Sequence, residues 1–478
     1  MELQKNMKIK LLGYLLVSMI GFSYLVLVRN AGISVPIFII IQFVCLYFLM
    51  PKKKPLLLFI PIFMLSLNSF ISANTIWRIP NFFVIISLFS VMSLWAVGDF
   101  SIKGELWRFI YKIIENACKP FRQFRIPIKW LSEINKERST TVQRMLIGIG
   151  VSIPFLIIIL VLLSSADEIF ARTITGFLEN TTSAVRIDTI YRTIVGAIAG
   201  LYLFGMVYLI HIYKSTYESS YALAIYKKPI NGDSIIINTV LGSILIIYTL
   251  FVTIQFRYLF AASSNLPYGL NYVEYARRGF FELLFLSGIN ITIILVAIWL
   301  TKHQNNIGAK ISKSLCGYLC VVTMVLLISS FYRMTLYSAE YGLTRLRFLV
   351  FGFLIFEAIG LIFTQLYIIK PKFNILAVYS IIGLTYYLLL NVVPMDTFIA
   401  RNQVKRYFAS GGDGIDYVVS LSADAASEVS HLYASDNDDT RQRVRNYYIR
   451  VDLDDAGWRQ WNLSASRVER YRSLTSKR

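Results

Sequence analysis

The sequence has few of the side chains that enzymes use most often for catalysis or for holding metals. Its three histidines, His211, His303 and His431, lie far apart along the chain. A zinc site or a histidine-based acid–base pair needs partners at spacings that these residues do not offer. Glycine-rich phosphate loops and kinase signatures are also lacking. We therefore predict no catalytic residue, no metal and no cofactor, and the sequence favours a protein that is not an enzyme.

Cysteine is equally scarce, with four residues in 478. Cys45, Cys316 and Cys320 fall in apolar runs, Cys118 falls in a basic segment, and none follows residue 394. This excludes a disulfide framework in the C-terminal part of the chain.

Charge is low throughout, and long apolar runs take its place. Charged residues make up 16% of the chain, hydrophobic residues 56%, and the mean hydropathy is +0.58, whereas soluble domains carry about 25% charged residues. A bilayer crossing needs roughly 20 helical residues. We predict about eleven spans, at 11–28, 33–50, 56–72, 81–98, 145–164, 190–212, 235–256, 280–300, 315–336, 347–369 and 374–394.

Lysine placement predicts the orientation of these spans. With about eleven spans and the N-terminus inside, every lysine before residue 395 falls on the cytoplasmic side, and the outer loops carry only arginine. This positive-inside pattern predicts an N-terminus in the cytoplasm and a C-terminus outside. Residues 395–478 hold 13 basic and 12 acidic residues, so nearly all of the net charge of +20 lies in the membrane part. We expect it to attract anionic lipids at the cytoplasmic face, and no nucleic acid, because the charges are spread over short loops.

A basic segment at 100–143 interrupts the spans. Within it Leu106, Ile110, Ile113 and Ala117 belong to one helical face, and Lys112 lies on the other. This pattern is typical of a helix lying on the cytoplasmic leaflet. An ordinary amphipathic helix docked on protein is the alternative.

The predicted fold class is all-α: a polytopic transmembrane helix bundle of about eleven spans with a small helical extracytoplasmic C-terminal domain. Four domains are expected: a four-helix membrane module at 1–99, the basic segment at 100–143, a seven-helix core at 144–394 and the C-terminal domain at 395–478. Helical spacing marks 414–434, 438–451 and 457–472 in the last of these. Trp458 and Trp461 are expected to anchor it on the membrane face or on a neighbouring helix. In the sixth span, Gly196, Gly200 and Gly205 predict a close helix–helix contact.

Polar residues gather at the predicted outer ends of the seventh to tenth spans, at one membrane depth. They are Gln255, Arg257, Glu274, Arg277, Arg278, Glu282, Arg333, Tyr337 and Glu340. A charged group near hydrocarbon is costly unless it pairs or faces water. Two interpretations stay open: an ion-pair network that orients the helices, or a ligand-binding cavity for an anionic or zwitterionic molecule from outside.

Glu357 stands apart from this polar cluster, in the middle of the tenth span. An intramembrane acid is a proton carrier or the partner of a buried polar group, for which Asn290 and Gln365 are the candidates. A protonated glutamate with a purely structural role is the alternative.

Three ordered blocks of residues resemble a known family. The first block comprises Gln255-Phe256, Tyr258 to Phe260 and Glu274 to Leu283; the second comprises Arg333, Leu336-Tyr337, Tyr341 to Thr344 and Arg347; the third comprises Asn391, Pro394, Asp396, Ile399 to Asn402, Asp416, Leu421-Ser422 and Asp424-Ala425. They are similar to bacterial membrane proteins grouped as domain of unknown function 4173, related to group 4153. The resemblance runs from about Ser164 to Ala425, and covers neither the first four spans nor the tail beyond about 435. It implies a bacterial cell-membrane protein and supplies no activity.

Two functions are compatible with these patterns. The first is a multi-pass sensory or regulatory protein of the bacterial cytoplasmic membrane, with a protein partner inside. The second is a transporter or lipid-handling protein that uses the outward-facing polar cavity and Glu357.

Overall fold

The computed structural model describes most of the 478 residues as helices. Besides residues 167, 170 and 304, the described ranges are 4–28, 30–98, 106–134, 187–213, 232–259, 280–301, 306–411, 414–451 and 457–476. Within these ranges every regular element is helical, as expected from the sequence.

The membrane helices and the two helices at their base follow one another along the chain. They are α1 (Lys5–Gly21, continued by the π-helical turn Phe22–Val26), α2 (Ser34–Leu49), α3 (Phe59–Ile71), α4 (Arg78–Val97), α5 (Leu106–Cys118), α6 (Arg125–Ile134), α9 (Ile187–Tyr213), α11 (Ser234–Leu259), α13 (Phe280–Thr301), α14 (Ile307–Tyr341), α15 (Arg345–Ile369) and α16 (Ile375–Val392).

Nine of the described helices are long and apolar enough to cross a membrane, so the chain is a multi-pass membrane protein. The span expected at 33–50 appears as α2, a shorter apolar helix of 16 residues. The span expected at 145–164 lies outside the described residues. The span expected at 315–336 is longer at both ends, because α14 has 35 residues. At about 1.5 Å per residue it measures about 52 Å, well beyond a hydrocarbon core of about 30 Å.

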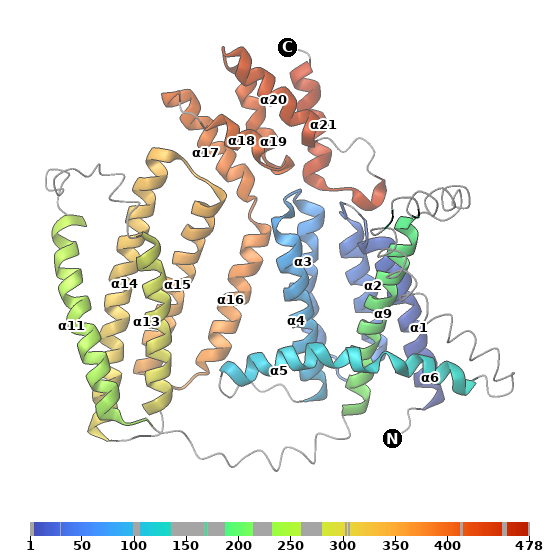
Figure 1. Ribbon diagram of the computed structural model, residues 1–478, viewed down its shortest axis with the longest axis horizontal. Helices are drawn as coiled ribbons and strands as arrows, with labels where there is room; N and C mark the ends of the chain where they lie inside the picture. Colours follow the sequence, from blue (N-terminus) through green and yellow to red (C-terminus); the bar gives the residue numbers. More distant parts are fainter. Residues whose placement is uncertain are drawn as a thin grey trace.

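The membrane helices form two bundles joined by α16 (Figure 1). The first bundle contains α1, α2, α3, α4 and α9, which share one apolar core around Leu11, Leu46 and Ile62. The second bundle contains α11, α13, α14 and α15, with a separate core around Leu241, Leu319 and Leu361. Helix α16 contacts α15 on one side and α3 on the other.

Small residues of α9 allow its neighbours to approach closely, as the sequence predicted. A Cβ atom at Gly196 or Gly200 would lie within 3.0 Å of main-chain atoms of Met19 on α1, and one at Gly205 would meet Pro120. Only glycine fits such contacts without moving a backbone.

Helices α5 and α6 lie across the end of the first bundle that we call the base (Figure 1). Asn116 of α5 is buried and donates to the main-chain oxygen of Ser90 on α4, at 3.1 Å. The ring of Trp130 on α6 packs edge-on against Phe204 of α9, with centroids 5.7 Å apart. Ile110 and Ile114 remain exposed. One side of this segment is therefore docked on protein, and another keeps an uncovered apolar surface.

The opposite end carries a helical assembly that we call the cap (Figure 1). It comprises α17 (Met395–Ser410), α18 (Ile415–Ser420), α19 (Ala426–Val429), α20 (Asp438–Val451) and α21 (Leu463–Ser476). Its own core is built from Ile399, Ala425, Val429, Val444 and Tyr447, all nearly inaccessible. The expected segment 438–451 matches α20, whereas α17 was not anticipated as a separate helix.

Candidate functional site: the contact between cap and membrane helices

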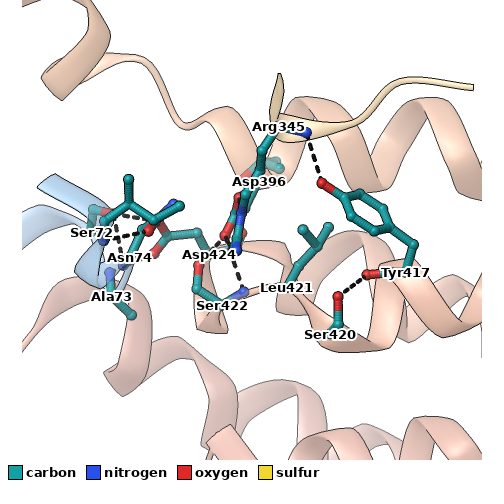
Figure 2. Close-up of polar contacts among 12 residues, drawn as sticks. Ser72, Ala73, Asn74, Arg345, Asp396, Tyr417, Ser420, Leu421, Ser422 and Asp424 are labelled. Atoms are coloured by element: carbon teal, nitrogen blue, oxygen red, sulfur yellow. Dashed lines mark hydrogen bonds and ion pairs between the residues drawn. The ribbon is translucent and has the colours of Figure 1, made fainter. Parts of the chain in front are cut away.

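The cap is joined to the second bundle by an ion pair between Arg345 and Asp396 (Figure 2). Arg345 opens α15, and its guanidinium donates to both carboxylate oxygens of Asp396 on α17, at 2.8 and 2.6 Å. The Asp396 carboxylate is inaccessible to solvent and also accepts from the main-chain nitrogen and hydroxyl of Ser422, at 3.1 and 2.6 Å. Burial alone would raise the pKa of Asp396, but the hydrogen bonds from Arg345 and Ser422 hold this pKa below its ordinary value.

A second acid, Asp424, joins the cap to the first bundle (Figure 2). One carboxylate oxygen accepts from the main-chain nitrogen of Ala73 at 2.7 Å, and the other accepts from the hydroxyl of Ser72. Both partners lie in the loop between α3 and α4. Thr397 of α17 donates to the main-chain oxygen of Asp424 at 2.7 Å, so Asp424 and Asp396 belong to one small piece of the cap.

The cap also fixes the loop between α14 and α15. Asn402 accepts from the main-chain nitrogen of Leu343 and Gln403 donates to its oxygen, both at 2.9 Å. The hydroxyl of Tyr417 accepts from the main-chain nitrogen of Arg345 at 2.7 Å (Figure 2). Gly342 enters this loop with φ 73° and ψ 174°, a conformation that side chains essentially exclude.

The C-terminal segment 458–462 runs over the loops of the first bundle. Main-chain nitrogens of Gly32 and Ile33 donate to the oxygens of Arg459 and Trp461, both at 3.0 Å. Trp461 packs on Phe70 of α3, with centroids 5.3 Å apart, and Trp458 lies 6.4 Å from Tyr24. Both tryptophans therefore contact membrane helices, in line with the anchoring role expected for them.

Two cavities border these contacts. One of about 260 Å³ lies between the cap and the first bundle, and its wall includes Arg78, Arg450 and Asn462. The other, of about 560 Å³, lies between α1 and α9, with Met19 and Ile20 on its apolar side and Arg459 at its rim. Among the described residues, no three His, Cys, Asp or Glu side chains gather as a metal ion would require.

The polar cluster predicted from the sequence is only partly described. Gln255 and Arg257 lie in the last turns of α11, and Glu274, Arg277 and Arg278 lie outside the described residues. Glu282 is exposed in the first turn of α13, Arg333 is buried on α14, and Glu340 is exposed near the end of α14.

Tyr337 connects this cluster to the α14–α15 loop. The guanidinium of Arg347 lies over its ring, 4.1 Å from the centroid. Arg347 also donates to the main-chain oxygen of Gly342, and Arg406 of the cap donates to that of Glu340. The cap end of α14 is thus tied both to α15 and to the cap.

Glu357 lies at the middle of α15 and is buried. Its hydrogen-bond partner is Ser287 of α13, at 2.7 Å, and not Asn290 or Gln365 as expected. Asn290 lies one helical turn further along α13, where it accepts from Tyr248 at 2.8 Å and donates to Thr323 at 3.1 Å.

A buried amide network, missed by the sequence reasoning, joins α16 to the first bundle. Asn81 of α4 donates to the side-chain oxygen of Asn391 at 2.8 Å and accepts from the hydroxyl of Tyr387 at 2.6 Å. Asn68 of α3 donates to the main-chain oxygen of Asn391 at 2.8 Å. Asparagines inside predicted spans are the signal that could have indicated this network.

These features define an all-helical multi-pass membrane protein with a helical cap bound to the loops at one end. The chain matches the family described as "Domain of unknown function (DUF4153)" over residues 59–432, and it belongs to that family. The match begins at the first residue of α3, so it includes two of the four spans that the resemblance noted above left out. No curated protein and no solved structure matches the chain.

Proposed function

We propose that this chain is a sensory or regulatory protein of a bacterial cytoplasmic membrane, without enzymatic activity. In this proposal the cap receives a signal outside the cell, and the bundles pass it to a protein partner at the base. The observation that carries the proposal is the pair of acids, Asp396 and Asp424, by which one piece of the cap holds loops of both bundles.

The mechanical argument follows from this connection. Asp396 and Asp424 are linked through Ser422 and Thr397, so a shift of this piece displaces the α3–α4 loop and the α14–α15 loop together. Coupling between distant sites requires an element that both sites can bias. The contact between cap and bundles is the candidate for that element.

The base is the proposed cytoplasmic contact face. The orientation rests on the lysine pattern, which gives the N-terminus inside and the C-terminus outside. Tyr111, Ile114 and Phe121 are exposed along α5 and the turn that follows it, beside Lys112 and Arg122. An apolar surface flanked by basic side chains suits a leaflet that contains anionic lipids.

The native thiol of Cys118 offers a test of signal passage. It is exposed at the base, whereas Cys316 and Cys320 are buried and Cys45 is half-buried. In full-length protein in nanodiscs, we expect Arg345→Ala at the cap to change the rate at which a water-soluble maleimide labels Cys118. Arg441→Ala, at an exposed arginine of α20, is the matched control. Equal labelling rates for the folded wild type and folded Arg345→Ala would contradict coupling between cap and base.

The orientation has its own test with the same thiol. In intact cells stripped of their outer layers, an impermeant maleimide should leave Cys118 unlabelled, whereas inverted membrane vesicles should expose it. Labelling in the intact cells would reverse the proposed topology.

A second candidate function is lipid handling or transport. The observation that favours it is the cavity of about 560 Å³ between α1 and α9, which combines an apolar wall with the guanidinium of Arg459. This combination suits a phospholipid, with its phosphate at the arginine. Native mass spectrometry should then show a bound phospholipid that Arg459→Ala releases; retention of the same lipid by the variant would remove the support that this cavity gives.

The finer assignments belong to the same proposal. The blocks around Arg277, Tyr337 and Asp396 support grouping the chain with domain of unknown function 4173. The polar cluster from Gln255 to Glu340 is proposed as the outward-facing ligand site, and the four-part division of the chain as its domain organisation.

A further inference from the structure

The second bundle contains a carboxyl group whose hydrogen bonds indicate its protonation state. The hydroxyl oxygen of Ser287 lies 2.7 Å from one carboxyl oxygen of Glu357 and 2.6 Å from the main-chain oxygen of Leu284. Both distances are typical of O–H···O hydrogen bonds. Ser287 is completely buried and Glu357 is 4% exposed.

Hydrogen counting constrains this arrangement. A serine hydroxyl carries one hydrogen, and a main-chain carbonyl oxygen can only accept. If Ser287 donates to Leu284, its contact with Glu357 needs a hydrogen from the carboxyl group. An ionised carboxylate is acceptor-only and cannot supply that hydrogen, whereas a neutral carboxylic acid can.

The surroundings of Glu357 favour the neutral form as well. Its flanking residues on the same helix face, Leu354 and Leu361, are almost inaccessible. Among the described residues, the structure gives Glu357 no ion pair and no hydrogen bond besides that from Ser287. Burying an unpaired carboxylate costs far more than burying a hydrogen-bonded acid.

The titratable and charged groups on the elements packed around Glu357 have other partners or lie at the helix ends. On α16, Tyr379 shares a hydrogen bond of 2.8 Å with Thr364. On α15 itself, Arg345 binds Asp396 and Arg347 lies over Tyr337. The remaining groups are Glu282 on α13, Tyr248 on α11, and Cys316, Cys320 and Arg333 on α14.

We propose that Glu357 is a proton-binding site of the second bundle, which carries its proton at neutral pH and donates it to Ser287. Loss of that proton leaves a carboxylate that must accept, so the hydrogen of Ser287 turns from Leu284 to Glu357. Proton binding thereby changes a hydrogen bond within α13 and a contact between α13 and α15. This inference rests on neither the sensory proposal nor the lipid cavity.

Infrared spectroscopy of the full-length protein in nanodiscs tests the proposal directly. A protonated carboxyl group has a C=O stretching band that is separate from the carboxylate bands. We expect this band in the wild type at pH 7, a shift of the band in deuterium oxide, and its loss in Glu357→Gln. Glutamine has nearly the same shape and retains a donor for Ser287, so this variant should keep the fold.

A second variant separates the hydrogen bond from the proton. Ser287→Ala removes the acceptor, so the carboxyl band should remain but move to the higher frequency of a free acid. The matched control is Glu340→Gln, at an exposed glutamate, which should leave the band unchanged. The proposal is overturned if the wild type and Glu357→Gln have the same spectrum in the carboxyl region at pH 7. A band that Glu340→Gln abolishes would overturn it too.

Discussion

Arg345 and Asp396 face each other where the membrane helices end and the cap begins. Two hydrogen bonds, of 2.8 and 2.6 Å, join the first residue of α15 to the second residue of α17, 51 residues further along the chain. Asp396 is inaccessible, whereas the side chain of Arg345 is 29% exposed. The pair therefore joins a fully buried acid to a base that still reaches water.

Asp396→Asn should destabilise the attachment of the cap. Removing one partner of a buried ion pair costs about 3–5 kcal/mol, and we expect about 2 kcal/mol here because Arg345 is partly solvated. The measurement is thermal unfolding of the purified protein, followed by loss of helical circular dichroism. The control is Asp438→Asn, which removes a 94% exposed partner of Arg441 and should change the midpoint little. Equal midpoints for both variants would mean that the buried pair adds nothing.

Acid should weaken the same attachment. The pKa of Asp396 is lowered in the folded protein, so its contribution to stability is present above the unfolded-state pKa of about 3.9. That contribution is lost as the pH falls from this value through the folded-state pKa. The difference in unfolding midpoint between wild type and Asp396→Asn should thus be constant near neutral pH and shrink below about pH 4. A difference that grows in acid would have the wrong sign.

Gly342→Ala should loosen the α14–α15 loop. The backbone at Gly342 lies in a region that only glycine populates readily, and a Cβ atom there would overlap Gln403 and Arg406. We expect a loss of about 1–3 kcal/mol in the free energy of unfolding. Gly383→Ala is the control, because a Cβ atom on that helical glycine of α16 meets nothing within 4 Å. An unfolding midpoint for Gly342→Ala that matches this control would contradict the prediction.

Asn81 and Tyr387 should show energetic coupling between α4 and α16. Asn81→Leu leaves the hydroxyl of Tyr387 and the side-chain oxygen of Asn391 without their partner, at a cost of about 1–2 kcal/mol. Tyr387→Phe in the same background removes one of these unsatisfied groups, so the double variant should lose less than the sum of the single losses. Unfolding of the four proteins of this cycle gives the coupling, and strict additivity would deny the network an energetic role.

Hydropathy predicted most of the fold because each span satisfies its backbone hydrogen bonds within its own helix. Helix α17 was missed because Met395–Ser410 mixes charged and apolar residues directly after α16, without the long apolar run that marks a span. The extension of α14 towards the base was missed for a similar reason, since Lys310 and Lys313 interrupt its apolar pattern.

The contacts of the site were harder to foresee. Asp396 belongs to a block that resembles the family, but its partner Arg345 looks like an ordinary basic residue at a helix end. Ser287 gives no signal in an apolar run, although it binds the acid that the sequence did single out. Such pairs depend on which helices become neighbours, and spacing along one helix does not contain that information.

The order of synthesis gives the strand-like run at 459–462 a particular importance. Asn462 donates to the main-chain oxygens of Ser69 and Ser72, and Arg459 donates to that of Tyr24, 435 residues earlier. The helices that leave the ribosome first thus receive their last contacts from residues made almost at the end. A chain truncated before residue 457 would insert all of its spans and still leave its earliest loops uncovered, a difference that quality-control proteases could detect.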